Sequence, residues 1–347
     1  MAYAFLNQSY IDSSDSNLVQ LIERTLTEIV IPEGVKQIGA HVFAYHYPLK
    51  KVKFPESLEI LSSNAFSWTA LTELDLPIGC KTLESYALYS CNEKGLERIR
   101  FGDTVRIGLS ALALNRKCLI YDFSRNTAVP SLDNTNAFNG INANAKILVP
   151  AALYEEWTQA TNWTEYASYI VPTAVLPVIE IPENASEGLF IENGVLKGRG
   201  SCTDSVIVVP DDVTGTAWQL FSGDNQIDTL ILPEKGIEIG GYLGENSTLR
   251  VLINYYYMST SVGLSATNHL EFISVIGNRD INNYQFTGLP TGIKYDFSRC
   301  ESVPVLSSVY YITVGEGTLI YVPLELYDEW INATNWLDLA EYIVVAR

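Results

Sequence analysis

Residues 26–48 read LTEIVIPEGVKQIGAHVFAYHYP, and this stretch decides how the chain folds. It opens with a β-branched run, which Pro32 ends because proline has no N–H to extend a strand ladder. Val35 and Ile38 follow three residues apart, and Phe43 then supplies one large apolar side chain. The stretch therefore predicts a short strand followed by a compact turn that carries an apolar plug.

The same order of residues returns three more times. The copies begin at residues 49, 71 and 96 and read LKKVKFPESLEILSSNAF, LTELDLPIGCKTLESYAL and LERIRFGDTVRIGLSAL. The steps between successive starts are 23, 22 and 25 residues. A period in this range is typical of a leucine-rich-repeat solenoid, in which no single coil buries its apolar side alone. We therefore predict a mainly β solenoid of short parallel strands, turns and 3-10 segments.

The period changes after KILVP (residues 146–150), which predicts one further strand. Leu153, Trp157 and Ala160 are spaced as on one face of a helix. A helix here would cover the open strand ladder and the last hydrophobic layer of the solenoid. We therefore predict short helical C-terminal caps in which Trp157, and its counterpart Trp330 later in the chain, are buried.

The second half of the chain repeats the first. VPAALYEEWTQATNWTEYASYIV from Val149 matches VPLELYDEWINATNWLDLAEYIV from Val322, and YDFSR occurs from Tyr121 and again from Tyr295. The strand run SVIVVPDDV likewise aligns with TEIVIPEGV of the first coil. These matches indicate a tandem duplication of an entire capped solenoid.

The boundaries of the two copies follow from composition. Residues 172–187, PTAVLPVIEIPENASE, contain three prolines and no repeat pattern, which predicts a semi-rigid extended linker. We predict a solenoid with a helical cap over residues 1–172, a Pro-rich linker over 173–185 and a second capped solenoid over 186–347. Residues 1–25 do not match the repeat, and we expect them to cap the first coil.

The repeat resembles a known family. The pattern L-x-x-I-x-I-P-x-x-V-x-x-I followed by A-F is similar to the leucine-rich repeats of the bacterial surface-protein BspA type, and FIENGVLKGRG from Phe190 is similar to the segment that often precedes the first coil there. The resemblance implies a right-handed solenoid used for adhesion and protein contact, without catalytic residues. The DFS…VP…LVP…W…NW ending also resembles proteins carried by phages and prophages of gut bacteria.

Charge and hydropathy exclude several partners. The formal charge is −18, so phosphate backbones and anionic lipid repel the chain and we predict no nucleic-acid binding. No apolar run is long enough to span a bilayer, and we predict no membrane insertion. The given N-terminus lacks the basic and apolar regions of a secretory signal, so location stays open, with cell-surface, extracellular or virion-associated placement favoured.

Residues that carry chemistry are sparse. Three histidines and five cysteines occur, none in the spacing of a metal site or a catalytic triad. The cysteines are expected to be reduced and buried. The paired carboxylates Glu155-Glu156 and Asp328-Glu329 fall in the first turn of predicted helices, where the helix dipole explains them. We therefore predict no enzyme activity, no metal and no cofactor.

Side chains alternate along a strand, so each predicted strand has one inward residue between two outward ones. In the first solenoid the outward residues change sign from one strand to the next, which predicts cross-strand ion pairs on an exposed face. The basic members are Lys51, Lys53, Arg98 and Arg100, and the acidic members are Glu28, Glu73, Asp75 and Asp122.

The corresponding outward face of the second solenoid is apolar. An exposed apolar patch usually marks an interface, and tyrosine-rich borders suit protein contacts. The candidate interface residues are Thr229, Ile231, Val251, Ile253, Tyr255, Tyr256, Tyr257 and Phe272. The alternatives are cover by the first solenoid, by the linker, by the N-terminal segment or by a second copy of the chain.

These observations favour a non-enzymatic protein-interaction or adhesion module built on bacterial leucine-rich repeats. The alternative is a structural or accessory protein of a phage or prophage particle, or a self-assembling surface unit. The expected partner is a protein, self or foreign, or a cell-surface glycan.

Overall fold

The computed structural model of the protein describes residues 10–11, 26–91, 96–183, 186–237, 239–241, 243–245, 247–256, 264, 267–281, 284 and 286–347. The chain divides into two compact units, Met1–Thr173 and Ala174–Arg347. The predicted N-terminal cap over residues 1–25 lies outside the described residues, except for one short strand at residues 10–11.

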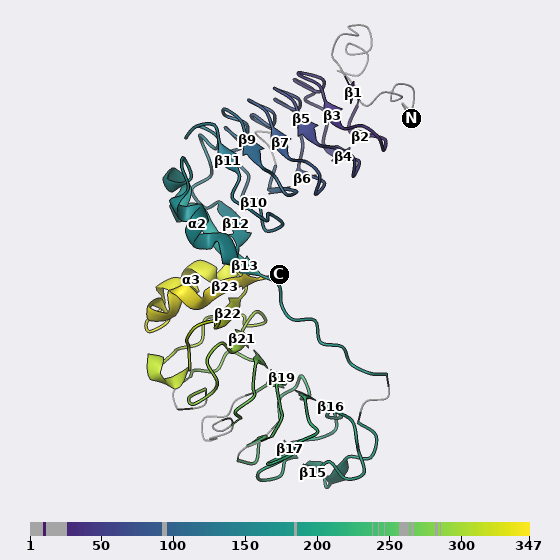
Figure 1. Cartoon of the computed structure of the whole chain (residues 1–347), viewed down its shortest axis with the longest axis vertical. Coiled ribbons are helices and arrows are strands. Elements are labelled where there is room, and N and C mark those ends of the chain that lie inside the picture. Colours follow the sequence, from purple (N-terminus) through teal and green to yellow (C-terminus); the bar gives the residue numbers. More distant parts are fainter. Residues whose placement is uncertain are drawn as a thin grey trace. The chain divides into compact units, whose positions relative to one another are not determined.

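The first unit contains two rows of short strands that stack side by side (Figure 1). The outer row consists of β2 (Glu28–Val30), β4 (Lys51–Lys53), β6 (Glu73–Asp75), β8 (Arg98–Arg100), β10 (Ile120–Asp122), β12 (Lys146–Pro150) and β13 (Ile170–Ala174). The second row consists of β1 (Tyr10–Ile11), β3 (Gln37–Ile38), β5 (Ile60–Leu61), β7 (Thr82–Leu83), β9 (Arg106–Ile107) and β11 (Ser131–Leu132). Hydrogen-bonded neighbours within each row are parallel, as in the pair β8–β10.

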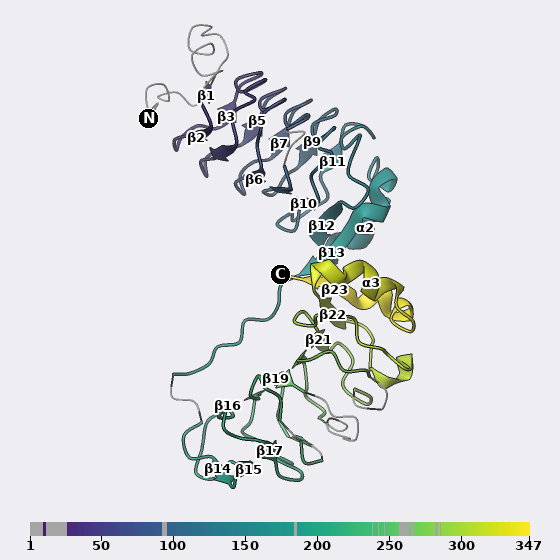
Figure 2. The same ribbon diagram turned by 180° about the vertical axis from the view of Figure 1, so that it is seen from behind.

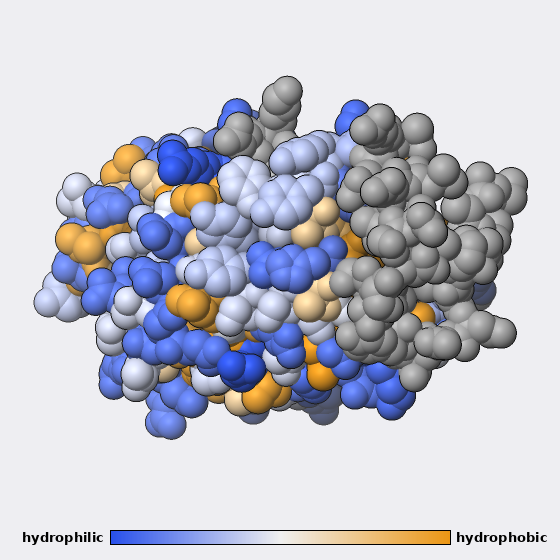
Figure 3. Space-filling model, turned by 90° about the horizontal axis from the view of Figure 1, so that it is seen from above, coloured by the Kyte–Doolittle hydropathy of each residue, from blue (hydrophilic) through white to orange (hydrophobic). Residues whose placement is uncertain are grey.

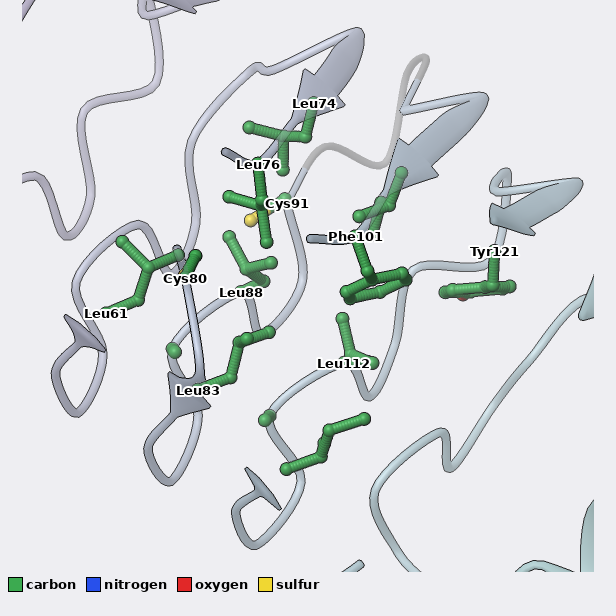
Figure 4. Packing of buried hydrophobic residues seen from close by; sticks show 14 of the residues in the cluster. Leu61, Leu74, Leu76, Cys80, Leu83, Leu88, Cys91, Phe101, Leu112 and Tyr121 are labelled. Carbon is green, nitrogen blue, oxygen red and sulfur yellow. The ribbon is translucent and has the colours of Figure 1, made fainter. Parts of the chain in front are cut away.

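The core of the first unit lies between these two rows. Each coil contributes the central residue of its outer strand, and Leu74, Ile99 and Tyr121 are at most 2% exposed. Figure 4 shows apolar side chains from successive coils, such as Leu61, Leu83 and Leu112, pointing into the same space. The inward position therefore repeats from coil to coil, and the register predicted from the sequence is confirmed.

A helical cap closes the first unit. It consists of η1 (Ala151–Leu153), α2 (Tyr154–Gln159) and η2 (Thr164–Tyr169), two of them 3-10 helices. Trp157 and Trp163 are both 0% exposed, and their ring centroids lie 5.3 Å apart. Phe123 lies 5.5 Å from the ring of Trp157, so the cap continues the aromatic core of the last coils. The predicted burial of Trp157 is confirmed.

The second unit has the same design. Its strand row consists of β16 (Val206–Val208), β18 (Thr229–Ile231), β19 (Val251–Tyr255), β20 (Phe272–Val275), β21 (Lys294–Asp296), β22 (Leu319–Val322) and β23 (Ile343–Ala346). Each of these strands has an inward residue that is 0% exposed, namely Ile207, Leu230, Leu252, Ile273, Tyr295, Ile320 and Ile343. The cap consists of η4 (Leu324–Leu326), α3 (Tyr327–Asn332) and η5 (Leu337–Tyr342), and a further 3-10 turn, η3 (Val309–Tyr311), precedes it. Trp330 is 0% exposed, as predicted.

The beginning of the second unit departs from the coil pattern. The segment FIENGVLKGRG forms an antiparallel pair of strands, β14 (Phe190–Glu192) and β15 (Val195–Gly198), and β17 (Gly215–Thr216) pairs parallel to β15. Residues 175–183 contain no helix or strand, in keeping with an extended segment. The first residues of the proposed linker are different, because β13 extends to Ala174 and pairs with β12.

Candidate functional sites

The outer strand face of the first unit carries a network of ion pairs. Arg98 Nη2 donates to Asp122 Oδ2 at 2.6 Å, and Arg100 Nε donates to the same oxygen at 3.1 Å. Arg125 reaches Asp75 at 2.9 Å from a coil two steps further along. The predicted pairing of opposite charges across these strands is therefore present for both arginines.

Asp122 differs from the exposed partner that the sequence predicts, because its side chain is only 3% exposed. Burial by itself raises the pKa of this carboxyl, but hydrogen bonds from Ser124, Arg98 and Arg100 outweigh burial and lower the pKa to about 2. The backbone N–H of Ser124 donates to Oδ1 at 3.1 Å, so both carboxylate oxygens are occupied. The recurring Asp-Phe-Ser turn thus holds a saturated carboxylate in this unit.

The predicted pairing is wrong for the two lysines. Neither Lys51 nor Lys53 makes an ion pair with any residue that the structure describes, and both are exposed. The reason is a break in the outer row, since β2 pairs with β4 while the ladder that follows begins at β6. An open groove of about 550 Å³ lies at this break, where Arg125 forms an ion pair with Asp75, one of the two acidic residues of β6.

The apolar strand face of the second unit is largely buried. Thr229, Ile231, Val251 and Phe272 are between 4% and 9% exposed, although each points away from the core row. Ile253 is half-buried. The equivalent residues of the first unit, in β4 and β6, are exposed. The second unit must therefore contain additional cover on this face.

Residues 174–183, called here the covering segment, provide this cover. Leu176 N–H donates to Arg347 O at 3.3 Å, and the Tyr321 hydroxyl donates to Val175 O at 3.2 Å, which fixes one end of the segment beside β22 and β23. Figures 1 and 2 show the segment running on the side of the strand row towards β14. Leu176, Pro177 and Ile179 are half-buried while Val178 is 87% exposed, so Val178 faces away from the strands.

A groove of about 360 Å³ lies between the covering segment and the strands. We call it the strand-face groove. It is lined by Leu176, Pro177, Ile179, Ile181, Ile231, Glu234, Ile253, Asn254, Phe272, Ser274, Asp296 and Arg299. Its walls are mainly apolar, and Asp296 and Arg299 of the second YDFSR motif supply charge of both signs.

The predicted interface tyrosine Tyr255 does not lie on the outward strand face. Tyr255 is 0% exposed and packs in the core, 6.1 Å from the ring of Phe286. The prediction of an outward Tyr255 is wrong because the ladder shifts register between Leu252 and Tyr255, where Asn254 adopts a φ of 61°. This bulge turns Asn254 outward, where its side chain donates to Leu232 O at 2.8 Å, and turns Tyr255 inward.

Tyr256 is half-buried against Arg279, whose guanidinium carbon lies 4.7 Å from the ring centroid. Arg279 Nε also donates to the Tyr256 hydroxyl at 2.8 Å. Tyr257 lies outside the described residues. Among the described residues, Tyr256 is therefore the one tyrosine at the rim of the candidate interface, and its ring is already engaged by Arg279 of the same unit.

A second candidate surface was not anticipated from the sequence. Five aromatic residues of the first unit lie in the turns around successive apolar plugs, and we call them the aromatic row: Tyr45, Tyr47, Trp68, Tyr86 and Tyr89. Tyr45 and Tyr47 are 55% and 64% exposed, and the other three are half-buried. The signal in the sequence is the position two residues after the plug, where Tyr45 follows Phe43 and Trp68 follows Phe66.

The aromatic row is held by the backbone of the coils. Tyr45 and Trp68 have φ angles of 63° and 60°, a left-handed conformation that is strained for a bulky residue. Their N–H groups donate to the next coil, from Tyr45 to Ser67 O at 2.8 Å and from Trp68 to Tyr89 O at 3.1 Å. Figure 3 shows one face of the molecule from above, on which hydrophilic, intermediate and hydrophobic residues are mixed, and tyrosine and tryptophan belong to the intermediate class. The row is thus a pre-formed surface.

Groups suited to catalysis are not gathered in the described part of the chain. No cluster of three potential metal ligands occurs among these residues. All five cysteines are free and buried. Burial raises the pKa of Cys80, Cys91, Cys118 and Cys300 to about 12, which removes them as nucleophiles at neutral pH. Among the described helices, none is long and apolar enough to cross a membrane.

The parallel strand rows and the helical caps define a leucine-rich-repeat solenoid. Within this class, residues 22–144 match the family model "BspA type Leucine rich repeat region" in six copies. This part of the chain therefore carries BspA-type leucine-rich repeats, and the resemblance drawn from the sequence is confirmed. Such repeats are generally a non-enzymatic scaffold for protein contacts.

Two solved structures are similar to the chain. The pneumococcal vaccine antigen PcpA is 16% identical with a TM-score of 0.30, over 92% of this chain and 79% of that chain. A leucine-rich repeat protein from Bacteroides ovatus ATCC 8483 is 13% identical with a TM-score of 0.27, over 93% of this chain and 84% of that chain. No curated protein matches the sequence.

Proposed function

We propose that this protein is a non-enzymatic protein-interaction module whose contact surface includes the aromatic row. The observation that carries the proposal is the exposure of Tyr45 and Tyr47, 55% and 64%, on a rigid backbone. Tyrosine and tryptophan dominate the energetics of protein interfaces, and a surface that is already ordered loses little entropy on binding. The BspA-type repeats beneath the row support the same class of function.

The arrangement of the rings favours a protein over a glycan. Sugars bind to free faces of aromatic rings, but the planes of Tyr45 and Trp68 are within 6° of parallel with centroids 6.5 Å apart. Tyr89 meets Trp68 edge-on at 5.9 Å. The rings of the row therefore pack against one another, and their hydroxyl groups and exposed edges suit hydrogen bonds and packing with a protein.

The test is a binding screen against a panel of purified extracellular and cell-surface proteins and a panel of glycans. The variant carries Tyr45→Ala with Trp68→Ala, and the matched control carries Tyr310→Ala, which removes a 79% exposed ring from the second unit. We expect a protein partner whose affinity falls by about tenfold or more in the double variant, as for interface hot spots, and is unchanged in the control.

Three results would refute this proposal. One is protein binding that survives loss of both rings, and another is ring-dependent binding to glycans alone. The third is a wild-type chain that forms a stable homo-oligomer through the aromatic row, which would favour a self-assembling surface unit or a structural component of a particle.

A further inference from the structure

The two YDFSR motifs place one aspartate at the same position of each unit. Asp122 ends β10, where it is opposite Arg100 of β8, and Asp296 ends β21, where it is opposite Ser274 of β20. Each accepts a hydrogen bond on Oδ1 from the backbone N–H two residues later, at 3.1 Å from Ser124 and 2.9 Å from Ser298. The backbone turn and the orientation of the carboxylate are thus conserved between the two units.

The partners of the second carboxylate oxygen differ. In the first unit Oδ2 accepts hydrogen bonds from Arg98 and Arg100 at 2.6 and 3.1 Å. Their positions in the second unit are occupied by Phe272 and Ser274. Asp296 makes no ion pair among the residues that the structure describes, although it is only 6% exposed. A carboxylate of this kind lacks the cation that its counterpart has.

Arg299, the nearby arginine of the same motif, does not fill this role. Its guanidinium donates to Asn254 Oδ1 and, at 3.3 Å, to Ser274 Oγ, and it lies 3.5 Å from Glu234. None of these three contacts is with the Asp296 carboxylate. The strand-face groove therefore contains an arginine held by polar neighbours and, separately, a carboxylate with an available oxygen.

The walls of the groove complete a binding site for one type of side chain. Phe272 and Ile253 from the strands, and Leu176 and Ile179 from the covering segment, line the space around Asp296. An arginine side chain has an apolar stem and a planar guanidinium, which forms paired hydrogen bonds with a carboxylate. Arginine is also the charged residue most enriched at the centre of protein interfaces.

We propose that the strand-face groove binds an arginine side chain of a partner protein, with the guanidinium on Asp296 and the stem between the covering segment and the strands. This inference rests on the proposed function as a protein-interaction module and names the chemistry of one contact. The first unit supplies the template, because there Arg98 and Arg100 of the same chain take the place of the partner's arginine.

The test uses a short amide-capped peptide with one arginine between two leucines, titrated against the full chain by calorimetry at low ionic strength. Matched peptides carry citrulline, a neutral analogue of arginine, or lysine. We expect the arginine peptide to bind at least about tenfold more tightly than the citrulline peptide, and the lysine peptide to be intermediate. Asp296→Asn should abolish the preference for arginine.

Two further variants keep the proposal falsifiable. Ser274→Arg should supply an internal guanidinium, as Arg100 does in the first unit, and block the peptide while Asp296 is retained. Asp228→Asn removes the same charge from an exposed ion pair with Arg250 elsewhere in the unit, and should leave peptide affinity unchanged. Thermal melting confirms that each variant is folded.

The proposal is overturned if the arginine and citrulline peptides bind equally, or if Asp296→Asn and Asp228→Asn weaken binding alike, since general electrostatic attraction would explain both results. The Tyr45→Ala, Trp68→Ala variant separates this proposal from the proposed function. It should bind the peptide normally, so loss of the aromatic contact and loss of the arginine contact are distinguishable.

Discussion

Each cap contains two buried tryptophans that differ in one respect. Trp163 Nε1 donates to Pro130 O at 2.7 Å, and Trp336 Nε1 donates to Pro304 O at 2.7 Å. The Nε1 groups of Trp157 and Trp330 have no hydrogen-bond partner among the described residues, although all four rings are 0% exposed. Each unit therefore contains one tryptophan whose indole N–H is hydrogen-bonded and one whose indole N–H is not.

Phenylalanine substitutions turn this difference into a measurable free energy. Trp163→Phe removes a donor and leaves the buried carbonyl of Pro130 without it, at a cost of about 1–3 kcal/mol. Trp157→Phe removes an N–H whose unsatisfied burial already costs about 1–3 kcal/mol, so relief of that cost offsets part of the loss of packing. The loss of ring volume is the same in both. We expect Trp163→Phe to destabilise the unit by at least about 2 kcal/mol more than Trp157→Phe.

The assay must report on each unit separately, because a chain with two units need not unfold in one step. Hydrogen exchange of the β12 and β22 amides in increasing urea provides this separation. Trp336→Phe should likewise destabilise more than Trp330→Phe, and Trp157→Ala, at about 3–5 kcal/mol, sets the scale for a full truncation. Equal destabilisation within both pairs would show that the unsatisfied indole N–H has no energetic cost, and would refute the reasoning.

Three further predictions follow from the geometry. The folded-state pKa of Asp122 is lowered from 3.8 to about 2, so the stability that this carboxylate contributes is present above pH 4 and is lost as the pH falls towards 2. Asp122→Asn should therefore make the free energy of unfolding less dependent on pH in that range. An unchanged pH dependence of unfolding would contradict this prediction. A thiol reagent at pH 8 should modify none of the five buried cysteines quickly in the native protein and all five in urea. Ile179→Ser should lower the melting temperature of a monomer, because it removes about 1 kcal/mol of apolar burial. Val178→Ser should not lower it, because Val178 is 87% exposed in the native protein. A change in oligomeric size with Ile179→Ser would contradict cover of the apolar face within the chain.

The repeat, the inward register and the caps were predictable from the sequence. A strand has a side-chain period of two, and an apolar residue between two polar ones, as at Ile99 between Arg98 and Arg100, leaves only one register. The cap followed from the helical spacing around Trp157, which no coil shares. These features depend on local pattern alone, which a single sequence contains.

Features that depend on one residue of backbone geometry were not predictable. In VLINYYY from Val251 every residue but Asn254 suits a strand, so the sequence does not show where a bulge reverses the direction of Tyr255. The unpaired Lys51 and Lys53 result from a gap in the ladder between β4 and β6, whose repeats are as regular as their neighbours in sequence. Both errors arise because hydrogen-bond register between coils is not encoded in hydropathy.

The covering segment lies between these two cases. Apolar residues fill most positions from Val175 to Ile181, and the linker was one of several alternatives for covering the apolar face, but the sequence did not distinguish it from a second copy of the chain. The aromatic row was missed for another reason. Tyr45 and Trp68 follow their apolar plugs by two residues, yet they occupy turns with positive φ, where large side chains are unexpected.

The duplication explains how one scaffold supports two different surfaces. Inward residues such as Ile99 and Ile273 are buried in both units although the outward positions beside them differ, so the stacking of coils does not depend on what the outward positions carry. Outward positions are therefore free to diverge. Phe272 and Ser274 of the second unit stand at the positions of Arg98 and Arg100 in the first unit. The face of the second unit is therefore more apolar and requires cover. Asp296 also has no ion pair among the described residues. The covering segment meets the first requirement, and Asp296 lines the groove that the segment borders, where we propose that a partner supplies the cation.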